Sequence, residues 1–252
     1  MIQFPFFGRN GKPHGKRGPY DIFAVGKEDP LFLEKFKGLR AIVEQKVDLH
    51  HMKLLGITSS VAGEGKTLCC AQLGRSLAST GRKKVLVVDM DVRKSDLTRG
   101  MGDRRTPGLT EHLLGGATLE QILRPTRCPN LYLVTSGIEV NSPADLLAGD
   151  PFKSFLQVIR KSFDAILLDT PPVLPVADTP TIRDLADGFL FVYRAGFTPY
   201  TLLRQAIEEL GEKHVLGAVL NGVEAASPGY YQKYYGSYYQ VHAKSDVLPE
   251  KK

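Results

Sequence analysis

The 252-residue chain has the composition of an ordinary globular protein, with 42% hydrophobic residues, no Trp and a formal net charge of +6. It is long enough to bury a full core in one large or two small domains. No stretch approaches the roughly eighteen apolar residues of a membrane span, and no signal-peptide pattern opens the chain, so we expect a cytoplasmic protein. The three cysteines lack metal-ligand spacing and are expected to be reduced: Cys69, Cys70 and Cys128.

The first 20 residues contain no acidic side chain and four basic ones: Arg9, Lys12, Lys16 and Arg17. Three phenylalanines lie in the same segment, at Phe4, Phe6 and Phe7. Such a segment is suited to an anionic lipid surface or to a membrane partner, and the same composition is typical of a solvated, disordered arm. We therefore separate residues 1–28 as a basic, flexible N-terminal arm.

Residues 29–45 show the pattern of an amphipathic helix. Asp29 is a good N-cap residue, and Pro30 fits the first helical position because its missing N–H has no helical partner there. Apolar residues then recur at helical spacing: Phe32, Phe36, Leu39 and Val43. A charged line spaced by three follows another face: Glu34, Lys37 and Arg40. We predict that ordered structure begins at Asp29.

Residues 54–67 read LLGITSSVAGEGKT, a short apolar strand followed by a loop of small residues and the start of a helix. Gly63 and Gly65 allow consecutive backbone N–H groups to turn toward phosphate oxygens. Lys66 adds a cation, and Thr67 adds a hydroxyl that can ligate Mg²⁺. The G-x-x-x-x-G-K-[ST] pattern is met except at its first position, Ser60. The alternative is a glycine-containing turn that binds nothing.

The remaining pattern alternates helices and strands. The helix after the loop continues through residue 79 and leads to a strand at 84–89, which completes a β-α-β unit. Short helices are predicted around 110–114 and 119–123, a strand at 131–135, helices at 143–147 and 151–161, and a strand at 165–169. Helix-strand pairs follow at 181–193 and at 199–210 with 215–221. This order predicts a three-layer α/β fold over residues 29–224, with a mostly parallel sheet flanked by helices on both faces.

Three aspartates follow predicted strands at their carboxyl ends. Asp89 and Asp91 end the strand LVVDMD, and Asp169 ends ILLD. In a sheet of this kind the carboxyl ends of the strands gather the ligand site. A carboxylate there can hold the Mg²⁺ that accompanies a nucleoside triphosphate. Any single one of them could instead be a helix cap or turn former.

The C-terminal segment contains six of the ten tyrosines, in three pairs spaced by four: Tyr230, Tyr231, Tyr234, Tyr235, Tyr238 and Tyr239. This spacing would align them on one face of a helix packed on the core. Gly236 and the Ser227-Pro228-Gly229 break favour a mobile tail at 225–252 instead. Taken alone, such a cluster is equally suited to base stacking or to contacts between subunits.

At this point the sequence resembles the bacterial tyrosine kinases, which are relatives of the MinD and ParA ATPases. TSSVAGEGKT, DMDVR and ILLDTPP resemble their Walker A, Walker A′ and Walker B motifs, and the likeness extends from about Asp29 to Asn221. Two departures, Ala62 and Ser95 where prolines are usual, are expected to change loop stiffness only. A third is Lys37 in a subunit-contact motif that otherwise has arginine there, which removes a bidentate donor.

The resemblance implies a protein-tyrosine kinase that transfers phosphate from ATP, with Mg²⁺, to its own C-terminal tyrosines. ATP is preferred over GTP because no N-K-x-D motif is present. The implied nucleotide-binding residues are Ser60, Ala62, Gly63, Glu64, Gly65, Lys66, Thr67, Leu68 and Asn221. Lys66, Asp89 and Asp91 are the implied catalytic residues, with Asp89 accepting the tyrosine proton, and Thr67, Asp91 and Asp169 are the implied Mg²⁺ ligands. Asp89 and Asp91 could exchange roles.

The resemblance also implies partners. Glu34, Lys37 and Arg40 are expected to join subunits into a ring in which each tail is phosphorylated by a neighbour. A membrane adaptor of the polysaccharide co-polymerase type would recruit the chain to the inner face of the cell membrane, where it would regulate exopolysaccharide or capsule synthesis or export. No nucleic acid is expected. The alternative function is a MinD- or ParA-like ATPase switch without kinase activity.

Overall fold

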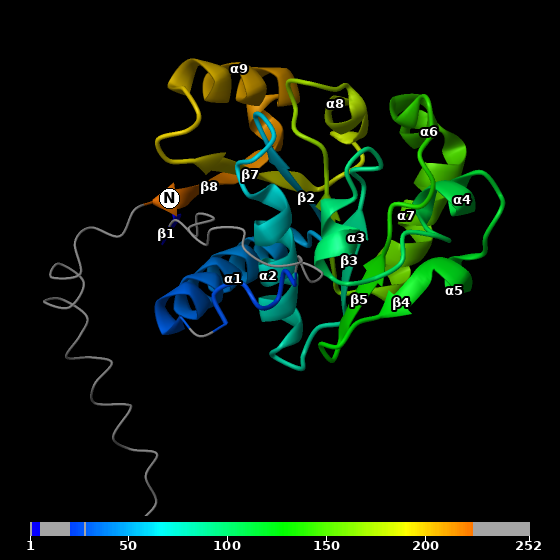
Figure 1. The fold of residues 1–252 in the computed structure, drawn as a ribbon, viewed down its shortest axis with the longest axis horizontal. Coiled ribbons are helices and arrows are strands. Elements are labelled where there is room, and N and C mark those ends of the chain that lie inside the picture. Colours follow the sequence, from blue (N-terminus) through cyan, green and yellow to red (C-terminus); the bar gives the residue numbers. More distant parts are fainter. Residues whose placement is uncertain (1, 6–20, 28, 224–252) are drawn as a thin grey trace, which may run out of the picture.

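An eight-stranded sheet lies at the centre of the computed structural model, which describes residues 2–5, 21–27 and 29–223. In spatial order its strands are β1 (Ile2–Pro5), β8 (Val215–Val223), β7 (Gly188–Arg194), β2 (Leu54–Ser59), β6 (Ala165–Asp169), β3 (Val85–Asp89), β5 (Leu131–Val134) and β4 (Leu123–Pro125). All neighbouring pairs are parallel except β5 and β4 (Figure 1). The predicted α/β fold with a mostly parallel sheet is confirmed.

Helices cover both faces of the sheet because the strands are apolar on both sides. Leu55 and Ile57 of β2 lie in the core under α1 (Pro30–His50), α2 (Lys66–Ala78) and α3 (Asp96–Gly100). Leu54 lies in the second core, on the opposite face. The other helices are α4 (Leu109–Leu113), α5 (Leu119–Ile122), α6 (Pro143–Ala148), α7 (Asp150–Ser162), α8 (Asp178–Ile182), α9 (Tyr200–Leu210) and the 3₁₀ turn η1 (Glu212–His214).

The start of α1 is as predicted. Oδ1 of Asp29 accepts hydrogen bonds from the N–H groups of Leu31 and Phe32, and Pro30 is the first helical residue. The helix continues five residues beyond the predicted end, to His50, because Val47 extends the buried apolar stripe by one further turn. His51 then closes it in the left-handed conformation, with φ 52°.

The short elements differ most from the prediction. α8 ends at Ile182, so the helix expected to begin at residue 181 lies earlier in the chain. α3, β4 and η1 were not predicted, because elements of three to five residues contain little periodicity and their detection depends on the residues around them. Among the described residues, no helix has both the length and the apolar character needed to cross a membrane.

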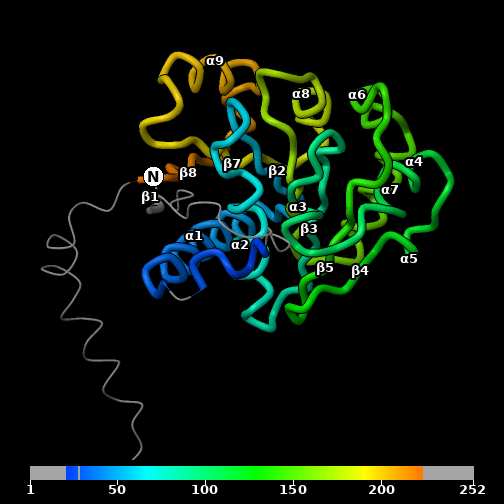
Figure 2. The backbone as a smooth tube through the Cα atoms, viewed as in Figure 1, coloured from blue at the N-terminus to red at the C-terminus, as the bar shows by residue number. Residues whose placement is uncertain are grey.

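The prediction that ordered structure begins at Asp29 is wrong. Residues 21–27 form a turn (Figure 2) in which Ile22 and Phe23 are 1% and 4% exposed. Ile2–Pro5 pairs in parallel with β8 as an edge strand. The turn was missed because its short apolar run, of which only Ile22 and Phe23 are buried, gives no periodic signal. The basic residues at positions 9–17 lie outside the described residues.

Glycine is required in the middle of β2. The ideal Cβ position at Gly56 lies 2.1 Å from the ring of Phe189 on the neighbouring strand β7, whereas a Cβ at Gly217 on β8 would meet no atom within 4 Å. We predict that Gly56→Ala lowers the free energy of unfolding by about 1–3 kcal/mol through overpacking. Gly217→Ala, the matched control, should change it by less than about 0.5 kcal/mol. Urea denaturation of both variants tests this; equal effects would contradict it.

Candidate active site

The loop between β2 and α2 has the backbone of a phosphate-binding loop. Gly63 and Gly65 have φ values of 91° and 97°, in the region that strains any residue with a Cβ. α2 begins at Lys66, so the N–H groups and the positive dipole end of its first turn adjoin the loop. Ser60 is fully buried in the same loop, and its Oγ has no hydrogen-bond partner among the residues that the structure describes. This backbone can cradle an anion.

The side chain of Glu64 faces the protein rather than the front of the loop. Its Oε2 accepts a hydrogen bond from the N–H of Val61 at 2.7 Å, and its Oε1 accepts one from the hydroxyl of Thr198, after β7. Burial raises the pKa of this carboxyl. Nδ2 of Asn221, on β8, donates to the carbonyl oxygen of Glu64 at 2.8 Å. Glu64 and Asn221 thus fasten the loop to the neighbouring strands.

Lys66 lies at the centre of the predicted site. Its Nζ is 3.3 Å from Oδ2 of Asp91, 3.5 Å from Oδ1 of Asp169 and 3.2 Å from the hydroxyl of Thr67. Burial disfavours the charge of Lys66, but the attraction of Asp169 and Asp91 outweighs it and raises the pKa of the ammonium group. The structure thus brings these four side chains together, although they come from three separate segments.

Asp89 lies beside this group but has different surroundings. It is fully buried and directly opposite Asp169 in the register of β3 and β6. Its Oδ2 accepts hydrogen bonds from the backbone N–H of Thr98 at 2.9 Å and from the Thr98 hydroxyl at 2.5 Å. Burial and the charge of Asp169 raise the pKa of Asp89 to about 7. Thr98, on α3, is a site residue that the sequence did not indicate.

Three oxygen-bearing side chains fit a hard cation. Asp169 is fully buried, and its Oδ1 forms an ion pair with Nζ of Lys66 at 3.5 Å. Neither of its carboxylate oxygens has a closer hydrogen-bond donor within the described part of the chain, and burial raises its pKa to about 6. Asp91 and the hydroxyl of Thr67 also contact Nζ of Lys66. Within the described ranges, no set of three His, Cys, Asp or Glu side chains is arranged to hold a metal ion. Two carboxylates and a hydroxyl are a donor set that suits Mg²⁺ when phosphate oxygens supply further ligands.

The expectation that Ser95 changes only the stiffness of the loop after the DMDVR motif is wrong. Its φ is 49°, and its N–H donates to the carbonyl oxygen of Asp91 at 2.7 Å. Proline could adopt neither feature, because its φ is fixed near −65° and it has no N–H. Serine at this position therefore changes the path of the loop after Asp91, and not only its stiffness.

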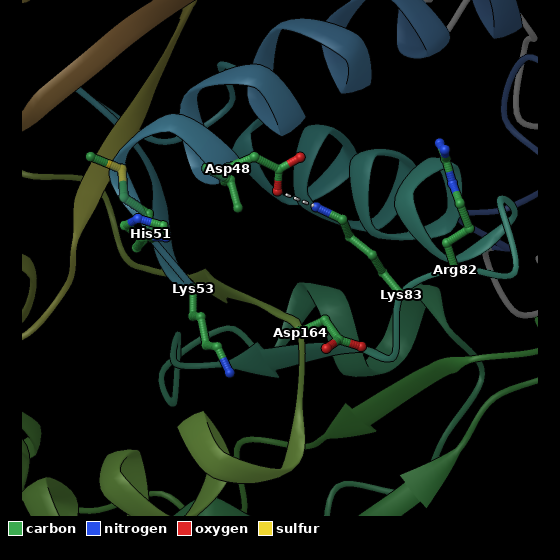
Figure 3. Close-up of a pocket in the computed structure, with 8 residues that line it drawn as sticks. Asp48, His51, Lys53, Arg82, Lys83 and Asp164 are labelled. Atoms are coloured by element: carbon green, nitrogen blue, oxygen red, sulfur yellow. Dashed lines mark hydrogen bonds and ion pairs between the residues drawn. The ribbon is translucent and has the colours of Figure 1, made fainter.

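A hollow of about 370 Å³ lies at the opposite end of the sheet, around the amino ends of β2, β3 and β6 (Figure 3). Two of the lysines that line it are already engaged. Nζ of Lys83 is 2.9 Å from Oδ1 of Asp48, and Nζ of Lys53 donates to the carbonyl oxygen of Arg160 at 3.1 Å. It takes no part in the site at the loop.

The three predicted subunit-contact residues do not form one exposed line. Glu34 and Lys37 form an exposed ion pair at 3.0 Å. Arg40 turns onto α2, where its Nη1 donates to the carbonyl oxygen of Ser76 at 3.1 Å. The other predicted group, the six tail tyrosines, lies outside the described residues.

Comparison with known proteins agrees with this geometry. A family described as an AAA domain matches residues 52–192. The tyrosine-protein kinase YwqD of Bacillus subtilis is 32% identical over 228 residues, which cover 90% of this chain and 95% of YwqD. The chain belongs to the bacterial tyrosine-protein kinase family. This membership supports the kinase interpretation over the ATPase-switch alternative.

Other similar proteins match this chain over different shares of their own length. The succinoglycan biosynthesis transport protein ExoP of Rhizobium meliloti is 30% identical over 222 residues, and the match covers 82% of this chain but 28% of ExoP. The BceF tyrosine kinase domain superposes with a TM-score of 0.73 at 28% identity, covering 81% of this chain and 82% of that domain. MinD of Pyrococcus horikoshii superposes with a TM-score of 0.59 at 22% identity, covering 72% and 76%, and shows the shared fold alone.

The bond between Thr198 and Glu64 gives a testable consequence. Thr198→Val removes the hydroxyl that donates to a buried carboxylate, so it should lower the free energy of unfolding by about 1–3 kcal/mol and weaken ATP binding. Thr198→Ser retains the donor and should stay close to wild type in both. Thermal unfolding and nucleotide titration measure the two effects. If the serine variant were as impaired as the valine variant, the hydroxyl would not be the fastening group.

Proposed function

We propose that this chain is an ATP-dependent protein-tyrosine autokinase that phosphorylates its C-terminal tyrosines in trans. The observation that carries the proposal is the convergence of Lys66, Asp91 and Asp169 at a phosphate-binding loop. It is supported by 32% identity to a tyrosine-protein kinase over 95% of that protein, and by six tyrosines near the C-terminus.

Phosphoryl transfer from ATP requires neutralisation of the charge that spreads over the transferring phosphate. The backbone N–H groups of residues 62–67, the start of α2 and the ammonium group of Lys66 bind and orient the triphosphate. Leu68 continues the first turn of α2, and Asn221 holds the loop from behind. Thr67, Asp91 and Asp169 would hold Mg²⁺, which supplies Lewis-acid stabilisation of phosphate charge when bound.

The tyrosine hydroxyl must lose its proton as it attacks, because its ordinary pKa is near 10. We assign Asp89 as the acceptor, because a carboxyl whose pKa is about 7 can take up a proton near neutral pH. Its Oδ1 accepts one hydrogen bond, from the N–H of Asp91 at 3.2 Å. Asp91 is the other candidate for the proton acceptor.

The tail is tethered to its own subunit, but a neighbour bound through α1 would present its active site at high effective concentration. The exposed ion pair of Glu34 and Lys37 is available for such a contact, with Arg40 bracing α1 against α2. Each phosphate adds about −1.5 to −2 charges, so a phosphorylated tail would repel its neighbours and loosen the ring. The similarity to ExoP, a succinoglycan biosynthesis transport protein, supports a role in polysaccharide synthesis or export. We further propose that a membrane adaptor of the polysaccharide co-polymerase type recruits the chain to the cell membrane.

Two substitutions separate the roles of the carboxylates. Asp89→Asn should abolish autophosphorylation while the affinity for Mg-ATP stays within about threefold, because it removes a proton acceptor and no metal ligand. Asp169→Asn should raise the Mg²⁺ concentration needed for half-maximal ATP binding. Titration of Mg²⁺ at fixed ATP measures both. Identical titration curves for the two variants would refute this division.

A mixing experiment tests transfer between subunits. One partner is Lys66→Met with an intact tail, which should be at least about a hundredfold slower by itself because it lacks the charge at the phosphate. The other is an otherwise wild-type chain ending before residue 228. The mixture should label only the Lys66→Met subunit, whereas a Lys66→Met chain also lacking the tail is the unlabelled control. Labelling of the shortened active subunit alone would exclude the tail as the substrate in trans.

A further inference from the structure

Residues 21–27, which we call the N-terminal strap, are fastened to α1, α2 and α3. The strap begins with a turn in which Oδ1 of Asp21 accepts a hydrogen bond from the N–H of Phe23 at 2.9 Å. Near its end Gly26 has φ 66°, and a Cβ there would overlap the ring of Phe32 in the first turn of α1. Phosphoryl transfer gives this segment no direct role, yet its residues Ile22 and Phe23 are buried in the core.

Hydrogen bonds from two side chains of α2 hold the strap, and one of these bonds is buried. Nε2 of Gln72, which is 1% exposed, donates to the carbonyl oxygens of Ile22 at 2.8 Å and Val25 at 3.2 Å. Arg75 donates to the carbonyl oxygen of Phe23 at 3.0 Å, and its guanidinium carbon lies 5.8 Å from the centre of the Phe23 ring. The strap is thus held on the helix whose first residue is the catalytic lysine, as the dark-blue segment beside α2 in Figure 2 shows.

The contact with α3 is a single backbone hydrogen bond. The N–H of Ile22 donates to the carbonyl oxygen of Gly100, the last residue of α3, at 2.7 Å. A helix of five residues is too short to be stable by itself, so contacts with the rest of the fold determine its position. Leu97 of α3 lies in the same apolar core as Ile22 and Phe23. The strap therefore supports the carboxyl end of α3.

α3 carries the residue that orients Asp89. Thr98 donates two hydrogen bonds to Oδ2 of Asp89, at 2.9 Å from its N–H and 2.5 Å from its hydroxyl, and it is 1% exposed. We propose that the strap is a positioning element for phosphoryl transfer: by holding the end of α3 it keeps Thr98 on Asp89 and so fixes the orientation of the Asp89 carboxylate, which lies opposite Asp169. This inference rests on the proposed function of Asp89.

Two substitutions at one position isolate the contact. Ile22→Pro and Ile22→Ala both lose the buried side chain, but only proline also removes the N–H that bonds to Gly100. Position 22 is the second residue of a turn closed by the hydrogen bond from the N–H of Ala24 to the carbonyl oxygen of Asp21, a place where proline is favoured. Ile22→Pro should lower kcat of autophosphorylation at least about tenfold below Ile22→Ala, with KM for ATP within about twofold.

A double-mutant cycle tests the route through Thr98. Thr98→Val keeps the shape and the N–H but removes the hydroxyl, and in that background Ile22→Pro should cost less kcat than it does alone, because both changes act on Asp89. Additive losses in kcat, or equal kcat for Ile22→Pro and Ile22→Ala, would overturn the proposal. Melting temperatures of all variants identify losses that are only structural.

Amide hydrogen exchange gives a readout that does not require kinase activity. In the Ile22→Pro variant the amide of Thr98 should exchange at least about tenfold faster than in Ile22→Ala. Unchanged exchange would overturn the inference about the strap even if the wild-type chain labels itself. A third outcome separates the two proposals. If Thr98 exchanges faster in Ile22→Pro but the wild-type chain forms no phosphotyrosine, the strap supports α3 and the proposed kinase function is wrong.

Discussion

The concentration of buried charge at the carboxyl ends of β3 and β6 is the constraint on which the rest of the structure depends. Asp91 and Asp169 form ion pairs with Lys66, and Asp89 lies opposite Asp169. Burial raises the pKa of Asp89 to about 7 and that of Asp169 to about 6. Removing such groups from water is unfavourable, and Lys66 only partly compensates. A fold keeps an arrangement of this kind where its charges serve chemistry, here the handling of a triphosphate and of one proton.

The surrounding elements hold these charges in place. Asp89 and Asp169 face each other because β3 and β6 are parallel neighbours in register. The loop before Lys66 is held by hydrogen bonds to Glu64. Asn221, which lies in β8, donates to the carbonyl oxygen of Glu64, and Thr198, which follows β7, donates to its carboxylate. Support from both directions leaves the loop and the carboxylates little freedom to move relative to each other, as preorganised phosphoryl transfer requires.

The parts that could be predicted from the sequence are those whose signal is local. The phosphate-binding loop could be predicted from the spacing of Gly63, Gly65 and Lys66. The long helices could be predicted from their periodicity, and the strands from their apolar runs. Thr98, Thr198 and the turn at 21–27 could not be found in this way, because each acts through a partner distant in the chain. Ser95 is a different case. The sequence shows that a serine replaces the usual proline there, but the left-handed conformation of Ser95 and its hydrogen bond to Asp91 are seen only in the structure.

Mass spectrometry of the purified chain after incubation with Mg-ATP tests the central claim most directly. The account predicts phosphate on several tyrosines between residues 230 and 239 of the wild-type chain, and none on the Lys66→Met variant. Hydrolysis of ATP with no phosphotyrosine on the wild-type chain would contradict the account, because the same loop and aspartates would then serve an ATPase switch.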